Sequence, residues 1–231
     1  MSNFANSKSV VLKNVRLDFF DIFKPGPPMA EKDRADPKKW KYKVKAIIEK
    51  DSEAATTAKA AMGEAARALW GDNAKNVVPM ITANSKAVRD GNGNIDTNGA
   101  IRPEYKDKLF ISASNVTKPQ VVGPQKVNGK FVSILEDGSA QIDGVTIPAP
   151  YKITAPYRGC YINLKVSFTA GKSFKVGSGE TLPNQIFAKL EAIQFLRDGE
   201  AFGSGPTSAE GFDDEAVESK DGLFDDDDIP F

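Results

Sequence analysis

Apolar residues recur at about every second position in several stretches of the chain, which is the spacing of a half-buried β-strand. These stretches are rich in Val, Ile, Phe and Tyr, and they lie at 9–20, 40–48, 109–114, 131–135, 157–169 and 185–196. We predict a strand in each of them.

Between residues 52 and 70, where alanine dominates, the spacing of the apolar residues becomes that of an α-helix. Ala58, Met62, Ala65 and Leu69 fall on one stripe of such a helix. Asp51 or Ser52 can cap its amino end. We predict one α-helix here.

Four long segments rich in Gly, Pro, Asn and Asp separate these elements and predict loops, at 24–39, 89–99, 136–144 and 169–184. No internal repeat is present. Five or six strands, one helix and long loops favour a mainly β fold, a small closed or partly closed barrel with elaborations.

After Gly203 the apolar residues follow neither the strand spacing nor the helix spacing, and Gly, Ser, Pro and acidic residues predominate. Such a segment buries too little apolar area to offset the entropy of ordering it. The sequence therefore predicts a folded domain at 1–203 and a disordered tail at 204–231.

The charges of the chain are divided between these two parts. Lys plus Arg and Asp plus Glu both number 31. Residues 204–231 contain ten acids and one base, a net charge of −9, so residues 1–203 carry +9. A basic body favours anionic ligands such as nucleic acid, and the acidic tail can imitate them.

Patterns typical of enzymes and metal sites are missing or incomplete. The chain has no His and one Cys, Cys160, which excludes an internal disulfide and a thiolate zinc site. The segment starting at Asp90 lacks the Gly and Glu of a calcium loop, and "GKS" at 171–173 lacks the first Gly of a phosphate loop. Asp18 and Asp21 are more typical of a solvated strand end than of a metal site. We expect no enzyme activity, no metal and no cofactor.

Cysteine usage and hydropathy also predict a location. The sequence shows neither the basic and apolar amino-terminal run of a signal peptide nor a stretch of about 18 apolar residues that would cross a bilayer. We expect a protein of the reducing cytoplasm, without a membrane partner.

Residues 38–48, "KKWKYKVKAII", place three lysines in phase on one face of the predicted strand. Lys41, Lys43 and Lys45 alternate with apolar residues and would lie roughly 7 Å apart. An ordinary solvated face of a half-buried strand gives the same pattern. The functional interpretation is a row of cations that follows the phosphates of an extended nucleic-acid strand.

Residues 157–169, "YRGCYINLKVSFT", show a similar division, with an apolar face that starts at Cys160. The opposite face presents Tyr157, Tyr161 and Lys165, whereas Arg158 breaks the alternation and is expected to precede the strand ladder. The tyrosines could simply be covered by a long loop. Alternatively, rings beside a basic row stack the bases of single-stranded nucleic acid, which is worth ~1–3 kcal/mol per base.

Two further aromatic residues are weaker candidates for such stacking. They are Tyr105 and Phe110, in "EYKDKLFIS". The predicted DNA-binding set is therefore Lys41, Lys43, Lys45, Tyr105, Phe110, Tyr157, Arg158, Tyr161 and Lys165.

The last eight residues, "FDDDDIPF", resemble the acidic carboxy-terminal tip of bacterial single-stranded DNA-binding proteins. In that family the tip docks replication and repair proteins through an apolar plug and an acidic run. The resemblance implies that Ile229, Pro230 and Phe231 form the plug and that Asp225, Asp226, Asp227 and Asp228 guide it electrostatically.

The body resembles a different family, phage single-stranded DNA-binding proteins with an oligonucleotide/oligosaccharide-binding (OB) barrel and an acidic tail. The similar segments are "WKYKVKAIIEKD", "YRGCYINLKVSF" and "LEAIQFLRDGEAFG". The resemblance implies an OB-fold-like barrel that coats single-stranded DNA in phage replication, repair or recombination and recruits host or phage proteins through its tip. It also places the protein in the cytoplasm of the host cell.

Two other functions remain open at this point. A strand-annealing or recombination-mediator protein would show the same residues, and so would a structural phage protein with a solubilising tail and no affinity for DNA. The sequence leaves the oligomeric state open.

Overall fold

Five strands form a closed barrel in the computed structural model, which describes residues 2–28, 31–147, 155–175, 177, 179 and 181–203. They are β2 (Val10–Gly26), β3 (Lys41–Ile48), β5 (Leu109–Asn115), β13 (Gln185–Arg197) and β10 (Tyr161–Gly171). Neighbours pair in that order, and β10 closes the ring by pairing with both β13 and β2. All these pairs are antiparallel except β5–β13. The predicted mainly β barrel is confirmed.

The backbone of strand β2 is irregular at two points, and its two halves pair with different neighbours. Asn14 has a φ of 54°, and the register with β10 shifts there. A second shift, between Leu17 and Phe19, leaves Asp18 as an extra residue opposite β3. Such bulges bend a strand and turn its side chains. The amino-terminal half of β2 therefore pairs with β10, and the remainder pairs with β3.

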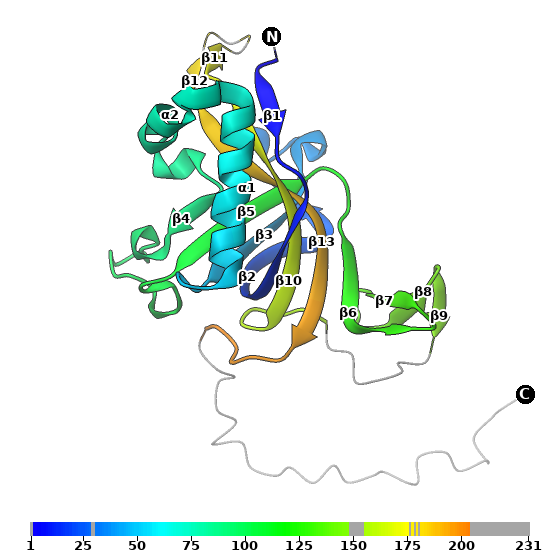
Figure 1. The fold of residues 1–231 in the computed structure, drawn as a ribbon. Helices are drawn as coiled ribbons and strands as arrows, with labels where there is room; N and C mark the ends of the chain where they lie inside the picture. The colour runs from blue at the N-terminus through cyan, green and yellow to red at the C-terminus, as the bar shows by residue number, and fades with distance from the viewer. Residues whose placement is uncertain are drawn as a thin grey trace, which may run out of the picture.

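Helix α1 (Glu53–Trp70) packs against β2, β10 and the short strand β1 (Phe4–Asn6) (Figure 1). Ser52 caps it, because its hydroxyl accepts the N–H of Ala55 at 3.2 Å. The buried side chains of its inner face are all alanines, which let the helix approach the strands closely. The predicted helix and its cap are confirmed.

Shorter helices accompany α1. Helix α2 (Ala74–Met80), which the sequence analysis did not predict, follows α1. The 3-10 helices are η1 (Glu31–Asp33), η2 (Pro37–Lys39), η3 (Gly71–Asn73), η4 (Ala83–Ser85), η5 (Gly91–Gly93) and η6 (Pro103–Tyr105). Within the described ranges, no helix has the length and apolar character needed to cross a bilayer.

An antiparallel arm projects from the barrel beside β13 (Figure 1). It consists of β6 (Gln120–Val127), β7 (Lys130–Ile134), β8 (Ala140–Ile142) and β9 (Val145–Ile147). Strand β4 (Val88–Asp90) pairs with β5, and β11 (Phe174–Lys175) pairs with β12 (Thr181–Leu182). The prediction of loops at 136–144 and 169–184 was thus partly wrong, because both segments contain short paired strands.

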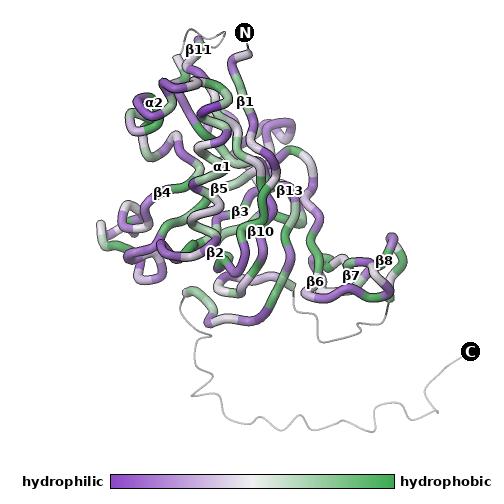
Figure 2. The backbone as a smooth tube through the Cα atoms, in the orientation of Figure 1, coloured by the Kyte–Doolittle hydropathy of each residue, from purple (hydrophilic) through white to green (hydrophobic). Residues whose placement is uncertain are grey.

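The core confirms the alternation seen in the sequence of β10. Cys160, Ile162, Leu164, Val166 and Phe168 are fully buried. Figure 2 shows the same contrast along the chain, with apolar stretches on the central strands and α1 and polar stretches in the outer loops. Burial raises the pKa of the Cys160 thiol to about 11, so this cysteine is a packing residue. The predicted disorder of 204–231 concerns residues outside those described.

Candidate nucleic-acid interface

The three in-phase lysines of β3 share one outer face, but their environments differ. Lys41 is exposed. Lys43 contacts Asp21 across the strand pair at 3.4 Å and donates to the carbonyl of Pro27. Lys45 is half-buried, 5.8 Å from the ring centroid of Tyr105. The sequence predicted the face correctly, and Lys41 is the most exposed of its three lysines.

Asp18 is 2% exposed and is bound by two partners from distant parts of the chain. The hydroxyl of Tyr105 donates to its carboxylate. Arg158 donates from Nε to the Asp18 carbonyl at 2.9 Å and from a terminal nitrogen to Oδ1 at 2.7 Å. A buried carboxylate needs such charge-assisted bonds. Asp18 therefore joins β2 to η6 and to the turn that precedes β10.

Tyr105 and Phe110 lie beneath the surface in this arrangement. Tyr105 is 0% exposed, Phe110 is 5% exposed, and their rings meet edge to face at 5.4 Å. With Ile47 they form a small apolar cluster outside the barrel, against which Phe202 packs. Burial and the bond to Asp18 raise the pKa of Tyr105 well above its usual range. Neither ring offers a free face here, and their role in DNA binding stays a prediction.

Positive charge collects around this cluster. Lys45 and Arg89 both lie 5.5 Å from the Phe110 ring centroid. Burial lowers the pKa of Lys45, Asp18 opposes that shift, and Arg102, Arg89 and Arg158 add to it. Such a concentration of cations on an apolar base favours an anionic ligand.

The segment after β13 crosses the turn before β10 at close range. A Cβ on Gly159 would lie 2.1 Å from the carbonyl oxygen of Glu200, and one on Gly199 would lie 2.3 Å from that of Gly159. Gly159 also has a φ of 101°, which other residues rarely adopt. Tyr157 fixes the crossing: its hydroxyl donates to the Gly199 carbonyl at 2.9 Å and accepts the Gly199 N–H at 3.0 Å. This ring is therefore held by the chain itself.

Tyr161 belongs to a row of alternating guanidinium groups and rings, which we call the Arg-aromatic stack. The Arg197 guanidinium lies 3.5 Å from the Tyr161 ring centroid. On β2, opposite Tyr161, Arg16 lies 5.4 Å from that centroid and 4.3 Å from that of Phe202. Arg16 is anchored by the carbonyls of Gly159 and Glu200, so the row is held in place. The stack consists of Arg197, Tyr161, Arg16 and Phe202.

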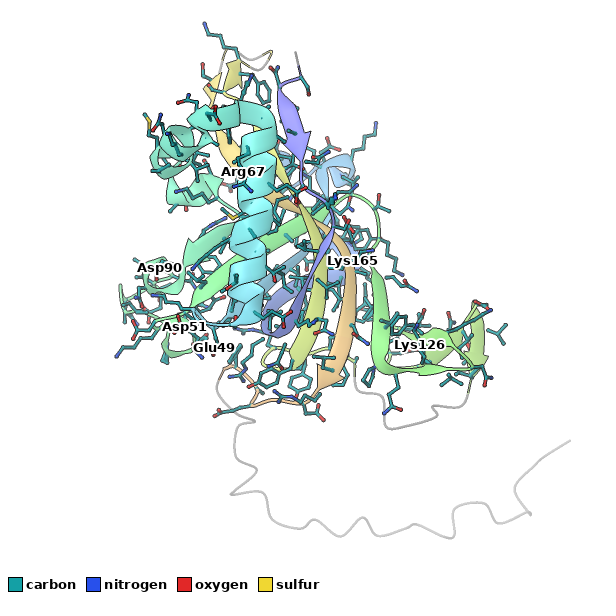
Figure 3. All side chains as sticks on the ribbon, viewed as in Figure 1. Glu49, Asp51, Arg67, Asp90, Lys126 and Lys165 are labelled. Atoms are coloured by element: carbon teal, nitrogen blue, oxygen red, sulfur yellow. The ribbon has the colours of Figure 1, made fainter. Side chains whose placement is uncertain are left out.

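The remaining cations of the predicted set are engaged in ion pairs. Lys165 projects from the outer face of β10 (Figure 3) and lies 3.8 Å from Glu191. Arg158 precedes β10, as its break in the alternation predicted, and pairs with Asp18. The structure thus brings Tyr157, Arg158 and Tyr161 together where the segment after β13 crosses the turn before β10. Lys41 and Lys165 lie on strands separated by β2.

Sequence reasoning missed Phe19 and most of the Arg-aromatic stack. Phe19 is 48% exposed and lies opposite Lys45 on the outer face. Its exposure results from the bulge at Asp18. The alternation of apolar and polar residues along a strand does not predict a bulge. Arg16, Arg197 and Phe202 meet Tyr161 only through strand pairing and the crossing of the last segment. The predicted docking residues, Asp225 to Phe231, lie outside the described residues.

A family model and a related phage protein both match nearly the whole chain. The family model described as "Enterobacter phage Enc34, ssDNA-binding protein" matches residues 8–223. "Putative protein p50" of Acyrthosiphon pisum secondary endosymbiont phage 1 is 27% identical over 220 residues, covering 93% of this chain and 98% of that protein.

Two solved structures are similar at lower identity. The single-stranded DNA-binding protein of bacteriophage Enc34 in complex with ssDNA is 20% identical, with a TM-score of 0.49, over 84% of this chain and 89% of that one. The single-stranded DNA-binding protein gp2.5 of bacteriophage T7 is 11% identical, with a TM-score of 0.41, over 92% of this chain and 98% of that one. The family match covers far more than half of the sequence, and the chain therefore belongs to the Enc34 family of phage single-stranded DNA-binding proteins, which are binders and not enzymes.

Proposed function

We propose that this protein coats single-stranded DNA during phage replication or recombination in the host cytoplasm. Its binding depends little on the base sequence of the DNA. The DNA lies across the outer surface of β2, β3 and β10. The observation that carries this proposal is the Arg-aromatic stack, because rings and guanidinium planes are both surfaces on which unpaired bases stack.

The neighbouring residues suit the backbone of such a strand. Lys41 is free to contact a phosphate, and Phe19 offers an exposed ring beside Lys45. Lys43 and Lys165 can exchange their carboxylate partners for phosphate, because partly exposed ion pairs contribute little to the stability of the fold. A phosphate near Lys45 would also favour its charged form, against the burial that lowers its pKa.

Not every residue of the predicted set has the same role in this proposal. Lys41, Lys43, Lys45, Arg158 and Lys165 contact phosphates, and Tyr161 stacks a base. Tyr157 can stack a base only if its hydrogen bonds to Gly199 break. Tyr105 and Phe110 support Lys45 from beneath. The tail at 204–231, with its charge of −9, competes with DNA for this surface, and its tip recruits host or phage replication and repair proteins.

The proposed activity is tested by fluorescence titration of the full-length protein with poly(dT) and with duplex DNA at several salt concentrations. We expect poly(dT) to bind more tightly than the duplex. The logarithm of the binding constant should fall linearly with that of the salt concentration, with a slope of about −0.7 per phosphate neutralised. Absence of poly(dT) binding in dilute buffer would refute the proposal.

Replacement of Tyr161 separates binding from stability. Tyr161→Ala should weaken poly(dT) binding by about 5- to 150-fold, the equivalent of one lost base stack of ~1–3 kcal/mol. Its urea midpoint should stay close to that of the wild type. Phe168→Ala is the matched control, because Phe168 is on the same strand but fully buried. It should lower the free energy of unfolding by about 3–5 kcal/mol. Unchanged binding by Tyr161→Ala would contradict the stacking role.

Truncation after Gly203 tests the competition between tail and DNA. Removal of nine net negative charges should tighten binding, most strongly at low salt, where the screening length grows from about 8 Å to about 30 Å. A full-length control with the acids of 204–231 changed to Asn and Gln should reproduce this gain. Weaker or equal binding by both variants would rule the competition out.

Deletion of residues 223–231 tests the docking role of the tip. We expect the deletion to abolish retention of host replication and repair proteins on the immobilised protein while poly(dT) binding persists. Phe231→Ala, which keeps the four aspartates, should lose most of the retention, because a partner would bury the ring. Retention that does not depend on residues 223–231 would disprove this role.

A further inference from the structure

Three phenylalanine rings gather at the end of β10 that lies opposite the Arg-aromatic stack. Phe4 and Phe187 are each 42% exposed, and Phe174 meets Phe4 edge to face at 5.9 Å. They belong to β1, β13 and β11, which come together at the carboxyl end of β10 (Figure 1). We call Phe4, Phe174 and Phe187 the distal aromatic patch. A single exposed ring needs no explanation, but rings that gather on one surface indicate a binding site.

Strand pairing places two of these rings on the outer face of the barrel. Phe187 lies opposite Thr169 of β10, and the residues on either side of it in β13 are buried. On the other side of β10, Phe4 lies opposite Gly171. A Cβ on that glycine would lie 2.9 Å from a ring carbon of Phe4, so the glycine lets this ring lie over β10. Rings are thus present on both sides of the carboxyl end of β10.

The outer face of β10 and β13 connects this patch to the Arg-aromatic stack. Thr169 follows Tyr161 by eight residues, which is about 26 Å of strand at roughly 3.3 Å per residue. Lys165, labelled in Figure 3, projects from the middle of this stretch. The outward side chains between the two groups of rings are polar, and they are Asn163, Lys165, Ser167, Lys189 and Gln194. A continuous strip therefore carries rings at both ends and polar groups between them.

The strip and the patch have an excess of positive charge. Lys172 and Lys175 flank Phe174 in the sequence, and Lys189 follows Phe187 on the same face. The ion pairs among the described residues include none of these three lysines. The one acid of β10 and β13, Glu191, lies 3.8 Å from Lys165. Rings with unpaired cations beside them suit a ligand that has both flat bases and phosphates.

We propose that the distal aromatic patch is a second stacking platform for the same DNA strand, which runs from the Arg-aromatic stack along the outer face of β10 and β13. Phe4 and Phe187 stack bases, and Lys172 and Lys189 contact phosphates. About eight stacked nucleotides, at 3.4 Å each, cover this distance, and OB folds bind about 4–16 nucleotides. This inference rests on the proposed function and extends it, because the second platform sets how many nucleotides one molecule covers.

Two platforms joined by one ligand act as a bivalent site. A strand long enough to reach both platforms gains the second contact without a second association step. A strand of four nucleotides is too short to stack on both, and the Arg-aromatic stack, with the lysines of β3 beside it, offers such a strand more contacts. The contribution of the distal aromatic patch should therefore appear only with longer strands.

The test measures fluorescence anisotropy of labelled dT16 and dT4 with the full-length protein. Phe187→Ala should weaken dT16 binding by about 5- to 150-fold, the effect of one lost base stack. It should weaken dT4 binding by no more than about twofold, because this strand can stay on the Arg-aromatic stack. Tyr161→Ala should weaken the binding of both oligonucleotides.

An exposed ring elsewhere on the molecule provides the matched control. Phe131, on the β6–β9 arm, is 41% exposed and has Lys126 at 4.8 Å from its ring centroid. Phe131→Ala should leave the affinity for both oligonucleotides unchanged, because this ring lies off the proposed path.

A variant of the lysines tests the phosphate contacts independently of the rings. Lys172→Ala/Lys189→Ala should make the logarithmic salt dependence of dT16 binding shallower by about 0.7 per lysine and leave that of dT4 unchanged. Urea unfolding first checks that each variant is folded. The double lysine variant decides the question if Phe187→Ala does not fold.

Three results would overturn the second platform. They are wild-type dT16 binding by the distal variants, equal losses for dT4 and dT16, and a changed oligomeric state of Phe187→Ala in sedimentation together with unchanged dT16 binding. The third result would assign the rings to contact with a second copy of the chain. If Tyr161→Ala weakens binding but the distal variants do not, the proposed function stands and this extension fails. Failure of the wild type to bind either oligonucleotide would instead refute the proposed function.

Discussion

The outer surface of the barrel depends on the buried carboxylate of Asp18. Its bonds to Tyr105 and Arg158 connect three segments that are far apart in sequence: β2, the η6 turn and the turn before β10. A charge that is 2% exposed is tolerable only with such partners, and loss of one partner leaves the other polar groups unsatisfied. The bulge that places Asp18 there also turns Phe19 outward, so one irregularity of β2 creates both the anchor and an exposed ring.

This anchor explains how a small barrel can present rings and cations without losing its core. The alternating side chains of β10 bury Ile162 and Leu164 and leave Tyr161 outside, where Arg16 and Arg197 contact it. The crossing of Gly199 over Gly159 then holds the last segment against the same surface. The described chain therefore ends beside the proposed DNA-binding surface, so the acidic tail begins close to the surface for which it would compete with DNA.

The sequence predicts those features that depend on local periodicity. The alternation from Cys160 to Phe168 gave the buried face of β10, and the alanines after Ser52 gave α1 and its cap. The composition of the loops could not reveal β8 or the β11–β12 pair, since these strands have only two or three residues. The environment of Lys45 was equally hidden, because Tyr105 reaches it from a non-periodic segment. The resemblance to phage single-stranded DNA-binding proteins, carried by three strand-sized motifs, is confirmed by the family match.

The central claim is that single-stranded DNA lies on the Arg-aromatic stack and the adjoining face of β3. The most direct measurement is photo-crosslinking of the full-length protein to oligo(dT) that carries 5-iodouracil, followed by mass spectrometry of the crosslinked peptides. The account predicts crosslinks to Tyr161 and Phe19, with peptides from the β6–β9 arm and α1 left unmodified. Crosslinks confined to the arm or to α1 would contradict it.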